Sequence, residues 1–208
     1  MPNIDINIAA AASEMRAYSL NLLTDTVRLA GDLGARGVVI GPGKANPLFP
    51  AETPELIEHF HSALGRLNPI ANSVGTSLWV ENMPFAFLPG IDQLMRALVG
   101  FGDDEIRIVY DAANAHFIGE DIASGLQRCK CRLALVHLSD TAQKIYKHDP
   151  VGEGTVPFGD ILSALAAVGY TVQSMLEIIS RNPDADIVAS AVKLAKQGLG
   201  SSVHLGKR

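Results

Sequence analysis

The sequence has few cysteines, no excess of basic residues and no long apolar run, and each lack excludes a class of protein. With only Cys129 and Cys131, neither a disulfide framework nor a four-cysteine zinc site is expected, and both thiols are expected to be reduced. Asp and Glu outnumber Lys and Arg by 22 to 17, so the net charge of -5 gives no general attraction to nucleic acid. The longest apolar-leaning run, 161–176, is interrupted by polar residues and is shorter than the roughly 20 residues of a membrane span.

The N-terminal segment also lacks the basic residues of a secretory signal, and Asp5 interrupts its apolar stretch. Together with the reduced cysteines, this predicts a cytoplasmic protein that binds neither membrane nor nucleic acid. Apolar residues are plentiful instead, at 48% of the chain, which is enough to bury a substantial core. A globular chain is therefore expected.

A short apolar run, a polar or Gly/Pro-rich loop and an amphipathic segment recur along the chain. This repetition predicts six βα units and a buried parallel sheet. The expected strands are residues 4–8, 37–40, 77–80, 106–110, 133–137 and 174–178. Loops are expected over DAANAHFIGED and from the fifth strand through GEGTVPFG. Because no linker composition divides the chain, residues 1–208 are interpreted as one domain.

The amphipathic segments predict where helices begin and end. The first helix is expected to begin at Ser13 and to stop at Gly34. Its inner face is expected to consist of Met15, Tyr18, Leu22, Leu29 and Leu33. A second helix, capped by Thr53, is expected to end or kink at Asn68-Pro69.

Six βα units suit either a doubly wound α/β sheet or part of a TIM-type (β/α)8 barrel. A dinucleotide-binding sheet should carry a glycine-rich turn after its first strand, where this sequence has AAAAS. A barrel instead places chemically useful residues at the C-terminal ends of several strands. The distribution of such residues favours the barrel.

Four consecutive predicted strands end in a side chain that could bind a metal. Glu81 follows SLWV, Asp111 follows IRIVY, His137 closes LALVH, and Glu177 lies in SMLEI. Because barrel strands end at one mouth, these residues could share one ion. Three carboxylates and one imidazole suit Mn2+, Mg2+ or Co2+, with Zn2+ or Fe2+ as alternatives. Taken singly, each residue is more often a helix cap, a solvated loop residue or a hydrogen-bonded core histidine.

The segments LWVENMP, IVYDAANAH, LVHLSDT, HDPVGEGTVPF and MLEI together resemble the xylose isomerase-like TIM-barrel superfamily. This is the sugar phosphate isomerase/epimerase group, which also includes endonuclease IV. The resemblance implies that Glu81, Asp111, His137 and Glu177 bind one divalent metal ion, and that Glu81 and Glu177 exchange protons with a sugar, sugar phosphate or sugar acid. The proton would be moved through a metal-stabilised enediolate, a chemistry that serves both isomerisation and epimerisation.

Four further residues are predicted to bind the substrate. They are Asn114, His148, Lys44 and Trp79. Asn114 stands where many relatives have a histidine. Lys44, in a loop after a strand, could meet a phosphate or carboxylate, although a loop lysine of this kind is more often solvated. For His148 the alternative is a surface loop histidine. Trp79 shares the strand face of Glu81, with a plain core residue as the alternative. His116 is expected to be a loop residue or to support the site.

Two other functions are weighed against the isomerase or epimerase. An endonuclease IV-like nuclease is disfavoured because Gly41 and Tyr146 stand at positions where its three-zinc cluster needs ligands. The other alternative is a noncatalytic or incomplete barrel that binds metal or ligand without turnover.

The chain length bears on that second alternative. A full (β/α)8 barrel takes about 250 residues, and the resemblance places Glu81 on the fifth strand although two predicted strands precede it. The first two βα units of eight are therefore expected to be missing, as in a chain that starts inside a longer gene. The two open sheet edges would favour a homo-oligomer, instability or aggregation.

Overall fold

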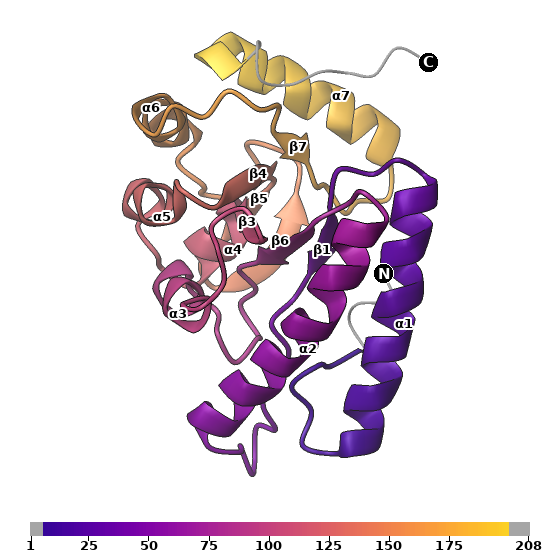
Figure 1. The fold of residues 1–208 in the computed structure, drawn as a ribbon. Helices are drawn as coiled ribbons and strands as arrows, with labels where there is room; N and C mark the ends of the chain where they lie inside the picture. The colour runs from indigo at the N-terminus through magenta and orange to yellow at the C-terminus, as the bar shows by residue number, and fades with distance from the viewer. Residues whose placement is uncertain (1–5, 200–208) are drawn as a thin grey trace. The chain divides into compact units, whose positions relative to one another are not determined.

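The computed structural model describes residues 6–199 and shows an α/β fold built on a parallel sheet (Figure 1). The sheet consists of β1 (Val38–Ile40), β2 (Leu78–Glu81), β3 (Ile106–Asp111), β4 (Leu133–Leu138) and β7 (Met175–Leu176). These strands follow one another in the sheet in chain order. The chain divides into two compact units, residues 1–108 and 109–208, and β3 runs from the first into the second. That the whole chain is one domain stays a prediction.

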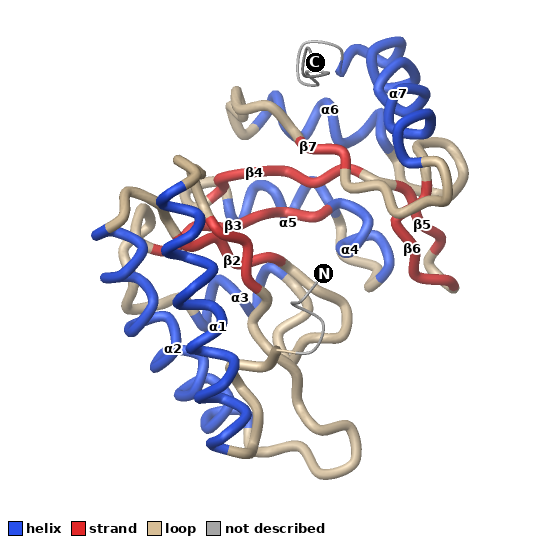
Figure 2. Tube along the Cα trace, turned by 90° about the vertical axis from the view of Figure 1, so that its right-hand side faces the viewer, coloured by secondary structure: helices blue, strands red, loops and turns tan. Residues whose placement is uncertain are grey.

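In the first unit, helices α1 (Ser13–Asp32) and α2 (Thr53–Ser73) lie side by side (Figures 1 and 2). The strands β1 and β2 pair in parallel, with Val39 opposite Trp79. The buried face of α2 is the predicted one: Leu56, Phe60, Leu64 and Leu67. Helix α3 (Ile91–Ala97) completes the regular elements described in this unit.

The inner face of α1 differs from the predicted one. The buried residues are Ser19, Leu20, Leu23 and Val27. The predicted face is largely exposed: 45% for Met15, 62% for Tyr18, 56% for Leu29 and 74% for Leu33. Because α1 carries two apolar stripes with helical spacing, periodicity alone could not select the one that packs. The end of α1 is as predicted, since Gly34 follows it with a φ of 67°.

Two further predictions for the first unit are corrected. Helix α2 does not end at Pro69 but continues to Ser73, where the burial of Leu67 and Ala71 on either side helps to offset the roughly 3 kcal/mol that an interior proline costs. A kink at Pro69 stays a prediction. Of the predicted strand 4–8, residues 4 and 5 lie outside the described part, and residues 6–8 form coil and a turn. The backbone N–H of Asn7 donates to Oγ of Ser19 at 2.8 Å instead of to a neighbouring strand.

The second unit contains α4 (Ala112–Phe117), α5 (Ile122–Cys129), α6 (Phe158–Ala167) and α7 (Pro183–Leu194). A short helical segment over 195–199 follows, and Gly198, with a φ of 97°, interrupts it. It also contains an antiparallel hairpin of β5 (Asp140–Ala142) and β6 (Ile145–Asp149). The loop predicted over DAANAHFIGED is wrong in part because it contains α4, and the loop predicted from the fifth strand through GEGTVPFG is wrong in part because it contains the hairpin. The two-residue turn between β5 and β6, Gln143-Lys144, has none of the Asn or Gly residues that mark such turns in a sequence.

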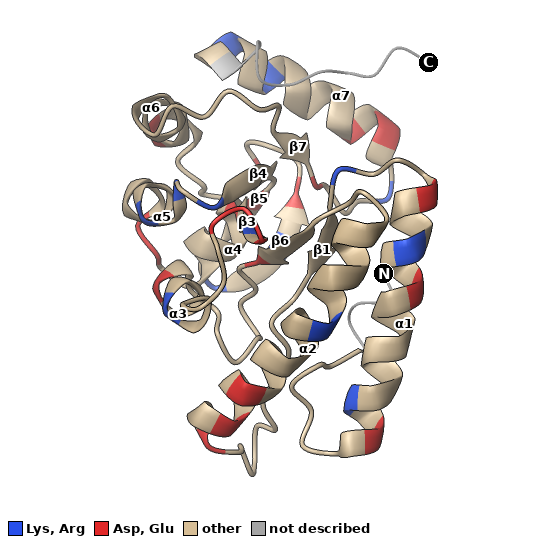
Figure 3. Cartoon of the chain, in the orientation of Figure 1, with Lys and Arg blue, Asp and Glu red and all other residues tan. Residues whose placement is uncertain are grey.

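Charges on α7 follow the polarity of the helix (Figure 3). Asp184 and Asp186 lie in its first turn and Lys193 in its last, which complements the helix dipole. Among the helices of the described residues, none combines the length and the apolar character needed to cross a membrane.

Candidate metal centre

Asp111 ends β3 and is also the N-cap of α4, so one residue connects the strand to the helix. Its Oδ1 accepts a hydrogen bond of 2.6 Å from the backbone N–H of Asn114, which satisfies a donor at the start of the helix. The carboxylate is completely buried. Its second oxygen, Oδ2, lies 3.9 Å from Nδ1 of His137. The cap therefore fixes Asp111 with one oxygen turned toward the neighbouring strand end.

His137 and Glu177 meet because β7 pairs with β4. In this register His137 lies opposite Met175, and the backbone N–H of Glu177 donates to the carbonyl oxygen of Leu138 at 3.1 Å. Glu177 thus sits just beyond the end of its short strand. Its Oε2 lies 3.1 Å from Nδ1 of His137, within hydrogen-bond distance.

The electrostatic surroundings of Glu177 favour its ionised form. Burial acts to raise the pKa of this carboxyl, but the pKa lies below its ordinary value because the hydrogen bond and charge of His137 outweigh the burial. Glu177 is therefore a carboxylate available to accept a proton or to bind a cation.

The arrangement of these side chains fits a divalent cation. Asp111, His137 and Glu177 each offer one ligand atom, and these atoms lie within 4.8 Å of one another. Ligands that each lie about 2.1 to 2.5 Å from one ion are at most about 5 Å apart. A cation would also offset the two closely spaced carboxylates, and the mixture of oxygens with one imidazole suits Mg2+, Mn2+ or Co2+. The second unit thus contains a candidate metal centre.

A hydrogen-bonded group of four side chains lies beside this centre and is called the Tyr146 cluster below: Asn114, Ser139, Tyr146 and His148. The hydroxyl of Tyr146 donates to Oδ1 of Asn114 at 2.6 Å and lies 2.8 Å from Nε2 of His148. Nδ1 of His148 lies 2.9 Å from Oγ of Ser139. The same Nδ1 is 3.7 Å from Oε2 of Glu177 and 4.0 Å from Oδ2 of Asp111.

The structure brings together five of the residues that the sequence predicted for the site: Asp111, Asn114, His137, His148 and Glu177. Ser139 and Tyr146 were not predicted, and Tyr146 was considered only as a missing zinc ligand. The alternation of Tyr146 and His148 along β6 would have indicated a shared strand face, had the hairpin been recognised.

Glu81, the remaining predicted ligand, belongs to the first unit. It is the last residue of β2, and it is buried, with 7% of its surface exposed. The strand thus ends in a buried carboxylate, as predicted. The role of Glu81 as a fourth metal ligand and second acid/base stays a prediction.

Trp79 lies in the interior of the first unit, where its ring covers Gly37 so closely that a Cβ at that glycine would overlap the indole. Its Nε1 donates to Oγ of Ser77 at 2.9 Å, toward the N-terminal side of β2. This placement favours the alternative of a core residue, since Glu81 stands at the opposite end of the strand. His116 contacts Oγ1 of Thr155 at 2.8 Å. It lies in the last turn of α4, so it is not the loop residue that was expected, and its role in supporting the site stays a prediction.

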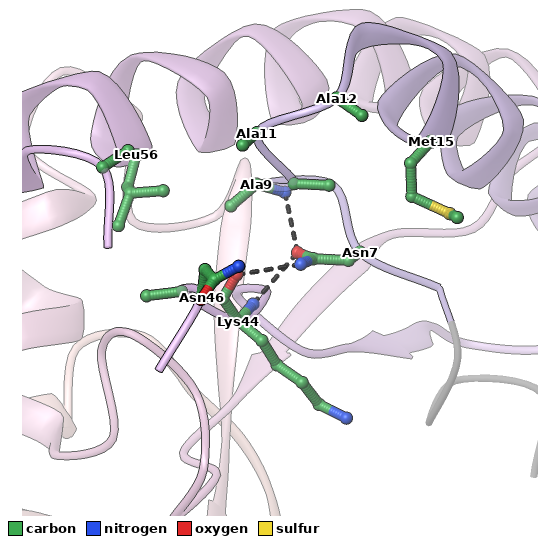
Figure 4. A pocket seen from close by; sticks show the side chains of 11 residues that line it. Asn7, Ala9, Ala11, Ala12, Met15, Lys44, Asn46 and Leu56 are labelled. Atoms are coloured by element: carbon green, nitrogen blue, oxygen red, sulfur yellow. Dashed lines mark hydrogen bonds between the residues drawn. The ribbon is translucent and has the colours of Figure 1, made fainter. Parts of the chain in front are cut away.

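Lys44 lines a pocket of about 370 Å3 in the first unit (Figure 4). Asn7 holds the backbone of Lys44, since its Oδ1 accepts from the Lys44 N–H at 3.0 Å and its Nδ2 donates to the Lys44 carbonyl at 2.8 Å. The lining is mostly apolar, with Met15 and Leu56 among a run of alanines. A contact between Lys44 and an anionic substrate stays a prediction.

Curated proteins similar to this chain include an uncharacterized protein and an epimerase. The uncharacterized protein of Methanocaldococcus jannaschii is 26% identical over 174 residues, which cover 81% of this chain and 59% of that protein. L-ribulose-5-phosphate 3-epimerase UlaE of Shigella boydii is 23% identical over 192 residues, which cover 89% of this chain and 67% of that protein. The chain therefore spans 59% and 67% of the lengths of these two relatives.

Solved structures show the same fold. A D-tagatose 3-epimerase-like protein superposes with a TM-score of 0.83 at 23% identity, covering 95% of this chain and 74% of that one. An L-ribulose 3-epimerase superposes with a TM-score of 0.75 at 19% identity, and the match covers 98% of this chain and 77% of that one. The family model of the xylose isomerase-like TIM barrel matches residues 1–198. The predicted fold is thereby confirmed, and the chain belongs to the xylose isomerase-like TIM barrel family.

Proposed function

We propose that this chain is a divalent-metal-dependent epimerase or isomerase of a small sugar, sugar phosphate or sugar acid. The observation that carries the proposal is the convergence of Asp111, His137 and Glu177, whose ligand atoms lie within 4.8 Å of one another. Several relatives and structural neighbours are sugar 3-epimerases by name, which supports a sugar as the substrate class.

The reaction consists of removing a proton from a carbon beside a carbonyl group and returning a proton. A bound divalent ion supplies Lewis acidity, which lowers the barrier by stabilising charge on the substrate oxygens. Asp111, His137 and Glu177 would hold the ion, with Glu81 as the proposed fourth ligand. Glu177 would take the proton at its carboxylate and, in isomerisation, return it to the neighbouring carbon; such a positioned general base is typically worth about 10² to 10⁴ in rate. Glu81 would act on the opposite face of the substrate in epimerisation.

Asn114 and His148 are the proposed substrate contacts in the second unit. They lie next to the metal ligands, since the N–H of Asn114 binds Asp111 and Nδ1 of His148 lies 3.7 Å from Glu177. Amide and imidazole groups can donate to and accept from sugar hydroxyls. A sugar bound at the ion would therefore have polar partners beside its reacting carbon.

Incorporation of solvent deuterium tests this function. The chain, loaded with Mn2+ or Mg2+ in D2O, should introduce deuterium into at least one ketose of a panel that includes ketose phosphates and sugar acids. Glu177→Gln should abolish the exchange because the amide cannot accept the proton. The control Glu58→Gln changes an exposed carboxylate on α2 and should keep the full rate. Metal binding without exchange on any sugar would support the noncatalytic alternative, and full exchange by Glu177→Gln would exclude Glu177 as the base.

A further inference from the structure

The Tyr146 cluster has no part in holding the ion or moving the proton in the proposed reaction, although it touches the site. Its side chains come from α4, from β6 and from the residue before β5. The ring of Phe117 lies 5.1 Å from the ring of Tyr146 and holds it in place beside His148. The cluster is thus a fixed group of donors and acceptors within reach of Glu177.

The positions of the protons in the cluster follow from its hydrogen bonds. A tyrosine hydroxyl has one proton, and that of Tyr146 is donated to Oδ1 of Asn114, an amide oxygen that can only accept. The 2.8 Å contact between the hydroxyl and His148 therefore requires a proton on Nε2 of His148. In the neutral imidazole Nδ1 then carries no proton, and it accepts from the hydroxyl of Ser139.

This tautomer matters because of what Nδ1 faces. Oε2 of Glu177 lies 3.7 Å away, so a small movement would bring it within hydrogen-bond distance. With a bare Nδ1 no such bond can form, and His148 adds no hydrogen bond to the one that Glu177 has with His137. With a protonated Nδ1, His148 would donate to Glu177, and a carboxylate that accepts an additional hydrogen bond is a weaker base.

We infer that Tyr146 is a positioning residue, whose hydroxyl keeps His148 in the Nε2-protonated tautomer and so prevents His148 from donating to the base Glu177. The kinetic consequence rests on the proposed function, whereas the tautomer does not. Asn114 also contributes to this tautomer, because it accepts the hydrogen bond that the Tyr146 hydroxyl would otherwise donate to His148.

The tautomer can be measured by long-range 1H–15N NMR of the imidazoles in the full 15N-labelled chain. Spectra are recorded without metal and with Mg2+ at about pH 8.5, above the ordinary imidazole pKa of about 6.5. His148→Gln assigns the His148 signals among the six histidines. The wild-type chain should show His148 protonated at Nε2. A proton on Nδ1 of the wild-type residue would overturn the inference.

Two variants should move that proton. Tyr146→Phe removes the acceptor for Nε2–H, and Asn114→Ala leaves the Tyr146 hydroxyl free to donate to His148, so both should shift His148 toward the Nδ1-protonated form. The control Tyr170→Phe also removes a hydroxyl with two hydrogen bonds, from the N–H of Val136 and to the carbonyl of Gln173, and should leave His148 unchanged. An unaltered tautomer in both test variants would refute the role of Tyr146.

The deuterium exchange assay adds a kinetic readout. Tyr146→Phe should lower kcat by about five- to tenfold, the size of one hydrogen-bond effect, while KM changes less than about twofold and Mg2+ binding is unaltered. A loss confined to KM, or an equal loss in Tyr170→Phe, would contradict the positioning role. If the wild-type chain exchanges no sugar at all, the proposed function fails, whereas the NMR result still decides on the tautomer.

Discussion

Replacing Asp111 by asparagine should separate its structural role from its role in metal binding. Asparagine caps a helix about as well as aspartate, so the bond from the Asn114 N–H to Oδ1 should persist and the metal-free chain should keep its stability. The second oxygen would become an uncharged NH2 group, which cannot bind a cation. Asp111→Ala removes the cap as well and should cost the metal-free chain about 1 kcal/mol in free energy of unfolding.

The expected size of the metal effect follows from linkage. An ion at 100 times its dissociation constant stabilises the folded chain by about 2.7 kcal/mol. For a chain of about 200 residues, 1 kcal/mol corresponds to roughly 2 to 4 °C in Tm, so saturating metal should raise the wild-type Tm by about 5 to 11 °C. Thermal melts after EDTA treatment, with and without added MnCl2, should show this rise in the wild-type chain and in neither Asp111 variant. Without metal, Asp111→Ala should melt about 2 to 4 °C below Asp111→Asn.

Asp121 is the matched control for this experiment. It caps α5 in the same way, by accepting from the N–H of Ser124 at 2.8 Å, but it is exposed and is not part of the cluster of candidate ligands found among residues 6–199. Asp121→Asn should therefore keep the metal shift, and Asp121→Ala should lower the melting temperature while keeping it. A full metal shift in Asp111→Asn would refute Asp111 as a ligand.

Two other predictions concern the cysteines and a loop glycine. Burial raises the pKa of the Cys129 thiol to about 12, whereas Cys131 is exposed. A thiol reagent at pH 8 should therefore modify one cysteine in the native chain and two in urea. Rapid modification of both cysteines in the native chain would contradict this. Gly154→Ala should lower the free energy of unfolding by about 1 to 3 kcal/mol, because its Cβ would overlap Oδ1 of Asp140, whereas Gly159→Ala, which has open space, should be neutral or stabilising in urea titrations.

The strands of the sheet and the candidate ligands at their ends could be predicted from the sequence because both are marked by short apolar runs that end in a charged or imidazole side chain. Apolar runs ending in Asp111, His137 and Glu177 define both the strand and the point where it reaches the site. The family resemblance rested on these segments, and the family model and the solved structures confirm it.

What could not be predicted depends on tertiary packing or on turns without marker residues. The packed stripe of α1 is chosen by its contact with α2, and α2 continues through Pro69 because its flanking residues are buried. The hairpin that carries Tyr146 and His148 turns at Gln143-Lys144, a pair without the Asn or Gly residues that mark such turns in a sequence. The Tyr146 cluster was missed for that reason.

Equilibrium dialysis of the EDTA-treated chain against Mn2+ tests whether Asp111, His137 and Glu177 form a metal site, because it counts ions without requiring the substrate to be known. We expect one bound Mn2+ per chain for the wild-type protein, and none for Asp111→Asn under the same conditions. No binding by the wild-type chain, or an unchanged single ion in Asp111→Asn, would contradict it.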